Sequence, residues 1–196
     1  MRRILFNLVI KPWIILAHKS YVNECKRHGK YCEYKGVYII SDPRYFADYD
    51  NYKSSVIAAL QLIEKVSMVR FLRLARDIDF ICNLALPGLN GLFVSVRKMC
   101  CVNFGIPSYR HDIGHLALLI IHEATHAHLI SIGTRMKHAR IEQICIREER
   151  RFFRMAFGHN PVVEKWFEER LQEPVLTSFA LFKIFLKNKE CFVERR

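Results

Sequence analysis

Five consecutive residues, His122-Glu123-Ala124-Thr125-His126, combine two imidazoles and a carboxylate in a pattern that could hold a metal ion. Residues four apart on a helix project from the same face one turn apart, so His122 and His126 could grip a single ion. Zinc suits two imidazoles and one further protein ligand, with a fourth position left open for water. Glu123 would lie beside the ion and could take a proton from that water. We therefore expect a zinc ion as the cofactor and Glu123 as the general base of a hydrolase.

The residues before this motif favour the metal interpretation. Leu116 to Ile121 are apolar on every face of a helix, which is typical of a helix that is buried all round. Two imidazoles and a carboxylate in such an interior are costly unless they are paired or bound to a metal. The alternative interpretation is that the two histidines are hydrogen-bonded core residues without a ligand.

Two helices are predicted around the motif. Asp112 is placed to cap the first helix, which runs to about Ile132 and is ended by Gly133. The second helix is predicted from about Arg135 to Phe157. Because the connection between them is short, the two helices should form an antiparallel hairpin.

A hairpin that turns near residue 134 would place residues 142–146 opposite the motif. Glu142 falls in this window, and we expect it to be the third metal ligand. Glu149 lies on the same helical face seven residues later and is the possible substitute ligand or the partner of a ligand imidazole. The alternative for Glu142 is a solvated or salt-bridged carboxylate near Arg140 or Arg147.

A hydrolase also needs hydrogen-bond donors that stabilise an oxyanion. Tyr109, His111 and His138 are possible oxyanion donors, together with His128, and the sequence does not choose among them. Surface or core roles are the alternatives for each. His128 is six residues after His122 and projects roughly 120° away from it on a helix, so we do not expect both to bind one ion.

The motif with Glu142 on the following helix resembles the gluzincin class of zinc metallopeptidases. In that class two motif histidines and a downstream glutamate bind zinc, and the motif glutamate is the general base. The resemblance therefore implies zinc at His122, His126 and Glu142, and a peptide or protein substrate. The strings His122 to Ala127 and Ala139 to Arg147 are similar to a group of short, largely uncharacterised bacterial proteins of metallopeptidase type.

The likeness covers residues 36–157 and has one departure from the gluzincin pattern. Gluzincins often place an acidic residue shortly after the ligand glutamate to orient a motif histidine, whereas Cys145 and Ile146 occupy those positions here. This departure, with the small size of the chain, favours an alternative function as a catalytically silent zinc-binding regulatory or interaction module.

The remaining sequence predicts an α+β fold, because short strands come first and helices later. We expect a small antiparallel sheet packed on the helix hairpin, with additional C-terminal helices. Two apolar runs broken by Pro87-Gly88 and Asn90-Gly91 are typical of a β-hairpin. The expected elements are a strand over 36–40, a turn over 41–43, a loop over 45–52, a helix over 54–68, the hairpin runs 80–86 and 92–96, a further strand over 99–104, and helices over 162–171 and 177–188.

We expect one domain over residues 21–196, preceded by an apolar and basic segment over 1–20. Residues 4–17 are largely apolar, but 14 residues are fewer than the roughly 20 that a spanning helix needs. The segment could lie on the inner face of a membrane as an interfacial helix, or pack on the surface of the domain. Seven cysteines are an odd count, which favours free thiols in the cytoplasm over a disulfide framework. Cys25 and Cys32 are interpreted as unpaired loop residues.

The formal net charge of +12 predicts a surface that attracts anions, including an anionic membrane surface. No basic tract is interleaved with aromatic residues, so we do not expect nucleic acid as a partner. A second alternative function is a peripheral membrane or nucleic-acid binding protein that acts through its basic surface. The sequence does not indicate an oligomeric state.

Overall fold

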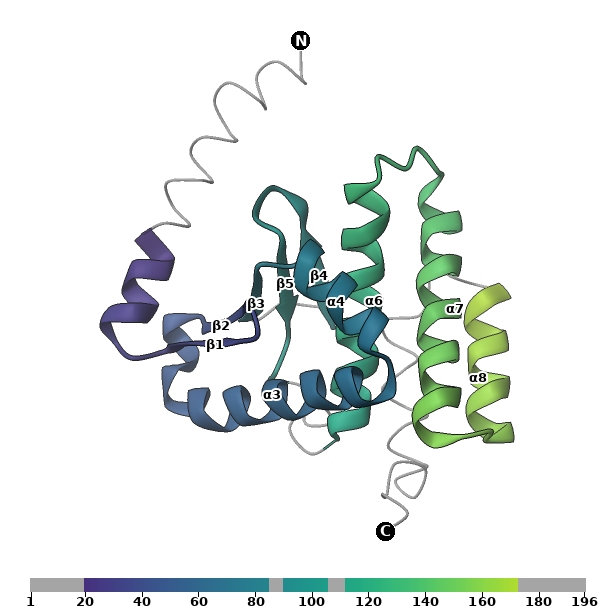
Figure 1. The fold of residues 1–196 in the computed structure, drawn as a ribbon, viewed down its shortest axis with the longest axis horizontal. Helices are drawn as coiled ribbons and strands as arrows, with labels where there is room; N and C mark the ends of the chain where they lie inside the picture. Colours follow the sequence, from purple (N-terminus) through teal and green to yellow (C-terminus); the bar gives the residue numbers. More distant parts are fainter. Residues whose placement is uncertain (1–19, 85–89, 106–111, 173–196) are drawn as a thin grey trace.

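The computed structural model describes residues 20–84, 90–105 and 112–172, in which a five-stranded sheet lies beside a group of helices (Figure 1). The strands are β1 (Tyr31–Tyr34), β2 (Val37–Ser41), β3 (Phe80–Asn83), β4 (Gly91–Val94) and β5 (Met99–Val102). The helices are α3 (Tyr49–Val66), α4 (Met68–Asp77), α6 (Ile113–Ser131), α7 (His138–Phe157) and α8 (Pro161–Gln172), with a further helical stretch over residues 20–27 and 3-10 turns at Pro43–Asp48 and Ser95–Arg97.

The predicted α+β class is confirmed, but the sheet is mixed and the expected antiparallel sheet is wrong. The strand order is β1-β2-β3-β5-β4, with β2, β3 and β5 parallel to one another and antiparallel pairs at the two ends. Helices α3 and α4 form the connection between β2 and β3, and a long connection of this kind is what parallel neighbours require. The predicted β-hairpin is also wrong, because β5 lies between β3 and β4.

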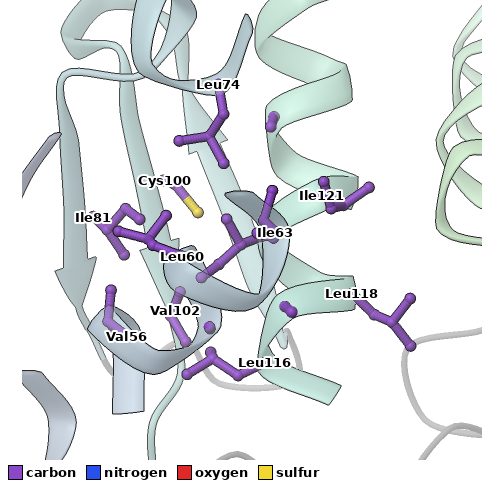
Figure 2. Packing of buried hydrophobic residues seen from close by; sticks show 14 of the residues in the cluster. Val56, Leu60, Ile63, Leu74, Ile81, Cys100, Val102, Leu116, Leu118 and Ile121 are labelled. Atoms are coloured by element: carbon purple, nitrogen blue, oxygen red, sulfur yellow. The ribbon is translucent and has the colours of Figure 1, made fainter. Parts of the chain in front are cut away.

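The two faces of the sheet pack against different helices. Alternate residues such as Ile39 and Ile81 point into the main core with side chains of α3, α4 and α6, as Figure 2 shows for Ile81. Their chain neighbours Ile40 and Cys82 point to the other face, where Cys25 of the helix over residues 20–27 joins them in a smaller core. Cys25 donates a hydrogen bond from its sulfur to the carbonyl oxygen of Ser41 at 3.2 Å, so this thiol is buried in the fold and is not a loop residue.

The predicted loop over residues 45–52 is wrong. A 3-10 turn at Pro43–Asp48 leads directly into α3, whose first turns bury the rings of Tyr49 and Tyr52. The hydroxyl group of Tyr49 donates to the carbonyl oxygen of Ile39 at 3.1 Å. Tyrosine can thus behave as a core residue when its hydroxyl group finds an acceptor, and the polar appearance of this stretch was misleading.

Helix α6 lies in the centre of the helical group and carries the His-Glu-x-x-His motif. Its predicted cap is confirmed, because the Asp112 carboxylate accepts a hydrogen bond from the backbone N–H of His115 at 2.9 Å. It contacts α3 and α4, strands β4 and β5, and α7, so its apolar residues are covered on most sides. Helix α7 lies beside α6, and α8 lies along α7 (Figure 1). Helix α7 begins at His138, three residues later than predicted.

The predicted N-terminal segment 1–20, apart from its last residue, and the predicted helix 177–188 lie outside the described residues. Within the described ranges, none of the helices has both the length and the apolar character needed to cross a bilayer.

Candidate metal centre

The two motif histidines face each other on consecutive turns of α6. Their ring centroids are 4.9 Å apart, and the Nε2 atom of His126 lies 3.1 Å from the Nε2 atom of His122. Both side chains are largely buried, with 13% and 18% of their surfaces exposed. Two imidazole nitrogens this close together repel each other unless a proton or a metal cation lies between them.

Helix α7 brings a carboxylate to the same point. The Glu142 oxygens lie 3.1 Å from Nε2 of His126 and 3.4 Å from Nε2 of His122. Ligand atoms bound tetrahedrally to zinc at about 2.0–2.1 Å stand about 3.3 Å from one another. The distance to His126 is from Oε1 and the distance to His122 is from Oε2, so a zinc ion among the two nitrogens and this carboxylate would have ligand atoms at about the separations seen here, with either one or both oxygens bound.

A second carboxylate contacts the far side of one ring. Glu149 of α7 is hydrogen-bonded to Nδ1 of His122, and both of its oxygens also accept bonds from Arg170 of α8. A donor role for Nδ1 fixes the tautomer in which Nε2 carries the lone pair that a metal binds. Glu149 therefore contacts Nδ1 of His122, whereas Glu142 contacts Nε2, and this position suits a residue that orients the imidazole better than a substitute ligand.

The charges around the rings shift several pKa values. Burial alone would lower the pKa of His122, but attraction to Glu149 and hydrogen bonds to both glutamates raise it to about 10. Burial would raise the pKa of Glu142, but the hydrogen bonds to His122 and His126 hold it well below its usual range. The pKa of Glu149 is lowered in the same way by Arg170 and His122 against its burial. The site therefore favours positive charge next to Glu142, either as a proton on His122 or as a metal cation that replaces it.

Glu123 is buried beside the two histidines and against strand β4. A Cβ atom added at Gly91 would lie 3.0 Å from Oε1 of Glu123 and 2.8 Å from a methyl carbon of Leu119, so only glycine fits here without movement. Burial raises the pKa of Glu123, while His122 and His126 act in the opposite direction. The motif glutamate thus has a defined position between the edge of the sheet and the two rings.

Cys145 offers another metal-ligating atom at the same place. Its Sγ atom and one nitrogen each of His122 and His126 all lie within 4.8 Å of one another. Burial raises the pKa of this thiol, which must be deprotonated to bind zinc. Glu142 is already ionised and contacts both rings at 3.1 and 3.4 Å, so we favour it over Cys145 as the third ligand.

The structure separates the predicted oxyanion donors. His138 is 77% exposed at the start of α7, with Nε2 3.5 Å from Glu142 Oε1, so it lies at the rim of the site. His128 faces away from the rings and is hydrogen-bonded to Asp77 of α4 at 3.1 Å. Tyr109 and His111 lie outside the described residues.

Arg170 and the Trp166 ring that it covers were not singled out from the sequence. The guanidinium carbon of Arg170 lies 4.5 Å from the centre of the Trp166 ring, next to the Glu149 contact. The two residues are four apart on α8, but nothing in a single sequence indicates which helix this pair would face. From the sequence, Cys145 was noted as the residue that stands where gluzincins often have an acidic side chain, and it was not predicted to be a metal ligand.

No family model matches the chain, and no significant similarity to a curated protein or to a solved structure was found. The functional argument therefore rests on the geometry of the residues themselves.

Proposed function

We propose that the protein is a zinc-dependent hydrolase that acts on peptide bonds, with zinc held by His122, His126 and Glu142. The convergence of two Nε2 atoms 3.1 Å apart on the Glu142 carboxylate, one oxygen of which lies 3.1 Å from His126 and the other 3.4 Å from His122, carries this proposal. Three protein ligands leave a fourth position of a tetrahedral ion for water, which is the arrangement of catalytic zinc sites.

The side chains around the site have distinct tasks. A zinc ion bound there would supply Lewis acidity and lower the pKa of a water molecule to near neutrality. Glu123 would accept a proton on a carboxylate oxygen from an attacking water molecule as a C–O bond forms at the substrate carbonyl carbon. The same carboxyl group then gives the proton to the leaving nitrogen as the C–N bond breaks. Burial against Gly91 keeps Glu123 in place for both transfers.

A peptide substrate is favoured by the strand that borders Glu123. Strand β4 is the last in the order of the described strands, and it pairs with β5 on one side. An edge strand can accept an extended peptide through main-chain hydrogen bonds. Because Gly91 of β4 lies against Glu123, a peptide paired with β4 would run next to the general base.

The test compares wild-type protein with Glu123→Gln. Both proteins should bind one zinc ion per chain. Cleavage of a mixture of unstructured synthetic peptides, followed by mass spectrometry, should be lost on chelation and restored by zinc in the wild type. The Glu123→Gln protein should cleave at least about 100-fold more slowly, because a general base contributes roughly 10²–10⁴-fold. Equal cleavage by both proteins, or a wild type that binds no zinc, would overturn the proposal.

Cys145 favours one alternative, a zinc-binding module without activity. If its thiolate joined His122, His126 and Glu142, four protein ligands would close the site to water, as in structural zinc centres. A Cys145→Ser variant separates the two functions. If the protein is the hydrolase, Cys145→Ser should keep a zinc affinity within about 3-fold of wild type. If Cys145 is a fourth ligand of a closed site, the same substitution should lower the zinc affinity by roughly 10-fold or more.

A further inference from the structure

We propose that Arg170 of α8 is a positioning residue for the metal site, because it fixes the Glu149 carboxylate that orients the His122 ring. This inference rests on the proposed zinc function. It places part of the support of the site on α8, a helix that lies beyond the motif and its hairpin.

The contacts form a continuous chain from α8 to the metal ligand. Nη1 of Arg170 donates to Oε2 of Glu149 at 2.6 Å, and Nη2 donates to Oε1 at 3.1 Å. Oε1 of Glu149 also accepts from Nδ1 of His122. Two parallel bonds from a planar guanidinium fix the plane of a carboxylate, which a single bond does not. The orientation of the His122 ring therefore depends on a carboxylate that cannot rotate.

This chain is shielded from water. The side chains of Arg170 and Glu149 are only 7% and 5% exposed, and the guanidinium covers the Trp166 ring at 4.5 Å. A buried carboxylate that loses its cation is strongly destabilised in the ionised form and changes its protonation or position. Loss of Arg170 should thus disturb Glu149 and, through it, the ligand geometry at His122.

A separate set of ion pairs also attaches α8 to α7. Glu164 of α8 is bonded to Arg150 and Arg154 of α7. Within the described ranges these three side chains form neither hydrogen bonds nor ion pairs with His122 or Glu149, so they provide a matched control. A Glu164→Gln substitution loosens α8 without breaking the chain through Glu149.

The experiment is a competitive zinc titration of the full chain against a chromophoric chelator. Arg170→Met should weaken zinc binding by roughly 10- to 100-fold, the range typical of residues that support a metal ligand. Glu164→Gln should change it by less than about 3-fold, because it does not touch this support. Adding Arg170→Met to Glu149→Gln should cost no further affinity, because Arg170 acts through Glu149.

Four results would overturn the inference. Equal losses in Arg170→Met and Glu164→Gln would mean that only helix docking matters. A double variant whose loss is the product of the two single losses would mean that Arg170 acts independently of Glu149. If Arg170→Met does not fold, Arg170→Lys keeps the charge without the paired bonds, and unchanged zinc affinity in that variant would overturn it. A wild type without zinc affinity would overturn the proposed function as well, whereas the first three results leave that function intact.

Discussion

Two histidine sites on α6 differ in how their carboxylates are neutralised. At one, His128 is hydrogen-bonded to Asp77 of α4 at 3.1 Å, and the Arg76 guanidinium also donates to Asp77 at 2.7 and 2.8 Å. At the other, the Glu142 carboxylate faces His122 and His126, and its ion pairs among the described residues are all with histidines. One carboxylate has a permanent cation, whereas the other is faced only by imidazoles, of which His122, with its pKa raised to about 10, is cationic only while it holds a proton.

This difference separates a structural contact from a candidate metal site. Arg76 neutralises the charge of Asp77, and His128 adds a hydrogen bond to it. The cluster therefore links α4 to α6 without a metal ion. Two Nε2 atoms and a carboxylate at one point are compensated only by a proton on an imidazole, and a divalent cation could take the place of that proton. A histidine beside a carboxylate therefore indicates a candidate metal site only where no arginine or lysine already neutralises that carboxylate.

The largest effect that tests this comparison is on zinc affinity. His126→Ala removes a proposed ligand and should weaken zinc binding by more than about 100-fold, since even supporting residues contribute roughly 10- to 100-fold. His128→Ala, two residues along the same helix, should bind zinc as the wild type does. Isothermal titration with zinc measures both. Similar losses of zinc affinity in His126→Ala and His128→Ala would contradict the separation of the metal site from the Asp77 site.

A smaller effect is expected on stability at the other site. Asp77→Asn removes the charged acceptor from Arg76 and His128 and should lower the free energy of unfolding by about 1–3 kcal/mol. Its zinc affinity should stay at the wild-type value. Urea denaturation monitored by circular dichroism, with zinc absent, gives the stability. A large loss of zinc affinity in Asp77→Asn would contradict the separation of the two sites.

The smallest expected effect is the pH dependence of that stability difference. Hydrogen bonds from Arg76, opposed by burial, lower the pKa of Asp77 below its ordinary value. A lowered folded-state pKa means that the stabilisation is present above the unfolded-state pKa of about 3.9 and is lost as the pH falls through the folded-state value. The difference between wild type and Asp77→Asn should thus be constant near neutral pH and shrink in acid below about pH 4. A difference that persists unchanged at pH 2 would exclude a charge effect.

Local signals in the sequence predicted the parts of the fold that depend on neighbouring residues. Asp112 as a cap, the apolar run before His122 and the end of α7 at Phe157 needed only capping chemistry and helical periodicity. The i+7 spacing likewise placed Glu142 and Glu149 on one face of α7. Because the connection between α6 and α7 is short, it limited how far the two helices could slide along each other, and this indicated that Glu142 would lie near the motif.

Features set by distant packing were not predictable in this way. Turn signals between β3 and β4 favoured a hairpin, but strand order depends on side chains from several elements, and β5 lies between the two. Helix α4 was not among the predicted elements, although the Ser67 hydroxyl group caps it by accepting a hydrogen bond from the backbone N–H of Arg70. The contact of Arg170 with Glu149 spans 21 residues and depends on how α8 docks, which no local pattern specifies.

The identity of the zinc ligands is the central claim, and X-ray absorption at the zinc edge tests it most directly. Wild-type protein loaded with one zinc ion per chain should show only nitrogen and oxygen ligands, at about 2.0–2.1 Å, with the signature of two imidazoles. The Cys145→Ser protein should give the same spectrum, and Glu142→Gln should change it. A sulfur ligand at about 2.3 Å that disappears in Cys145→Ser, or a chain that takes up no zinc, would contradict the account.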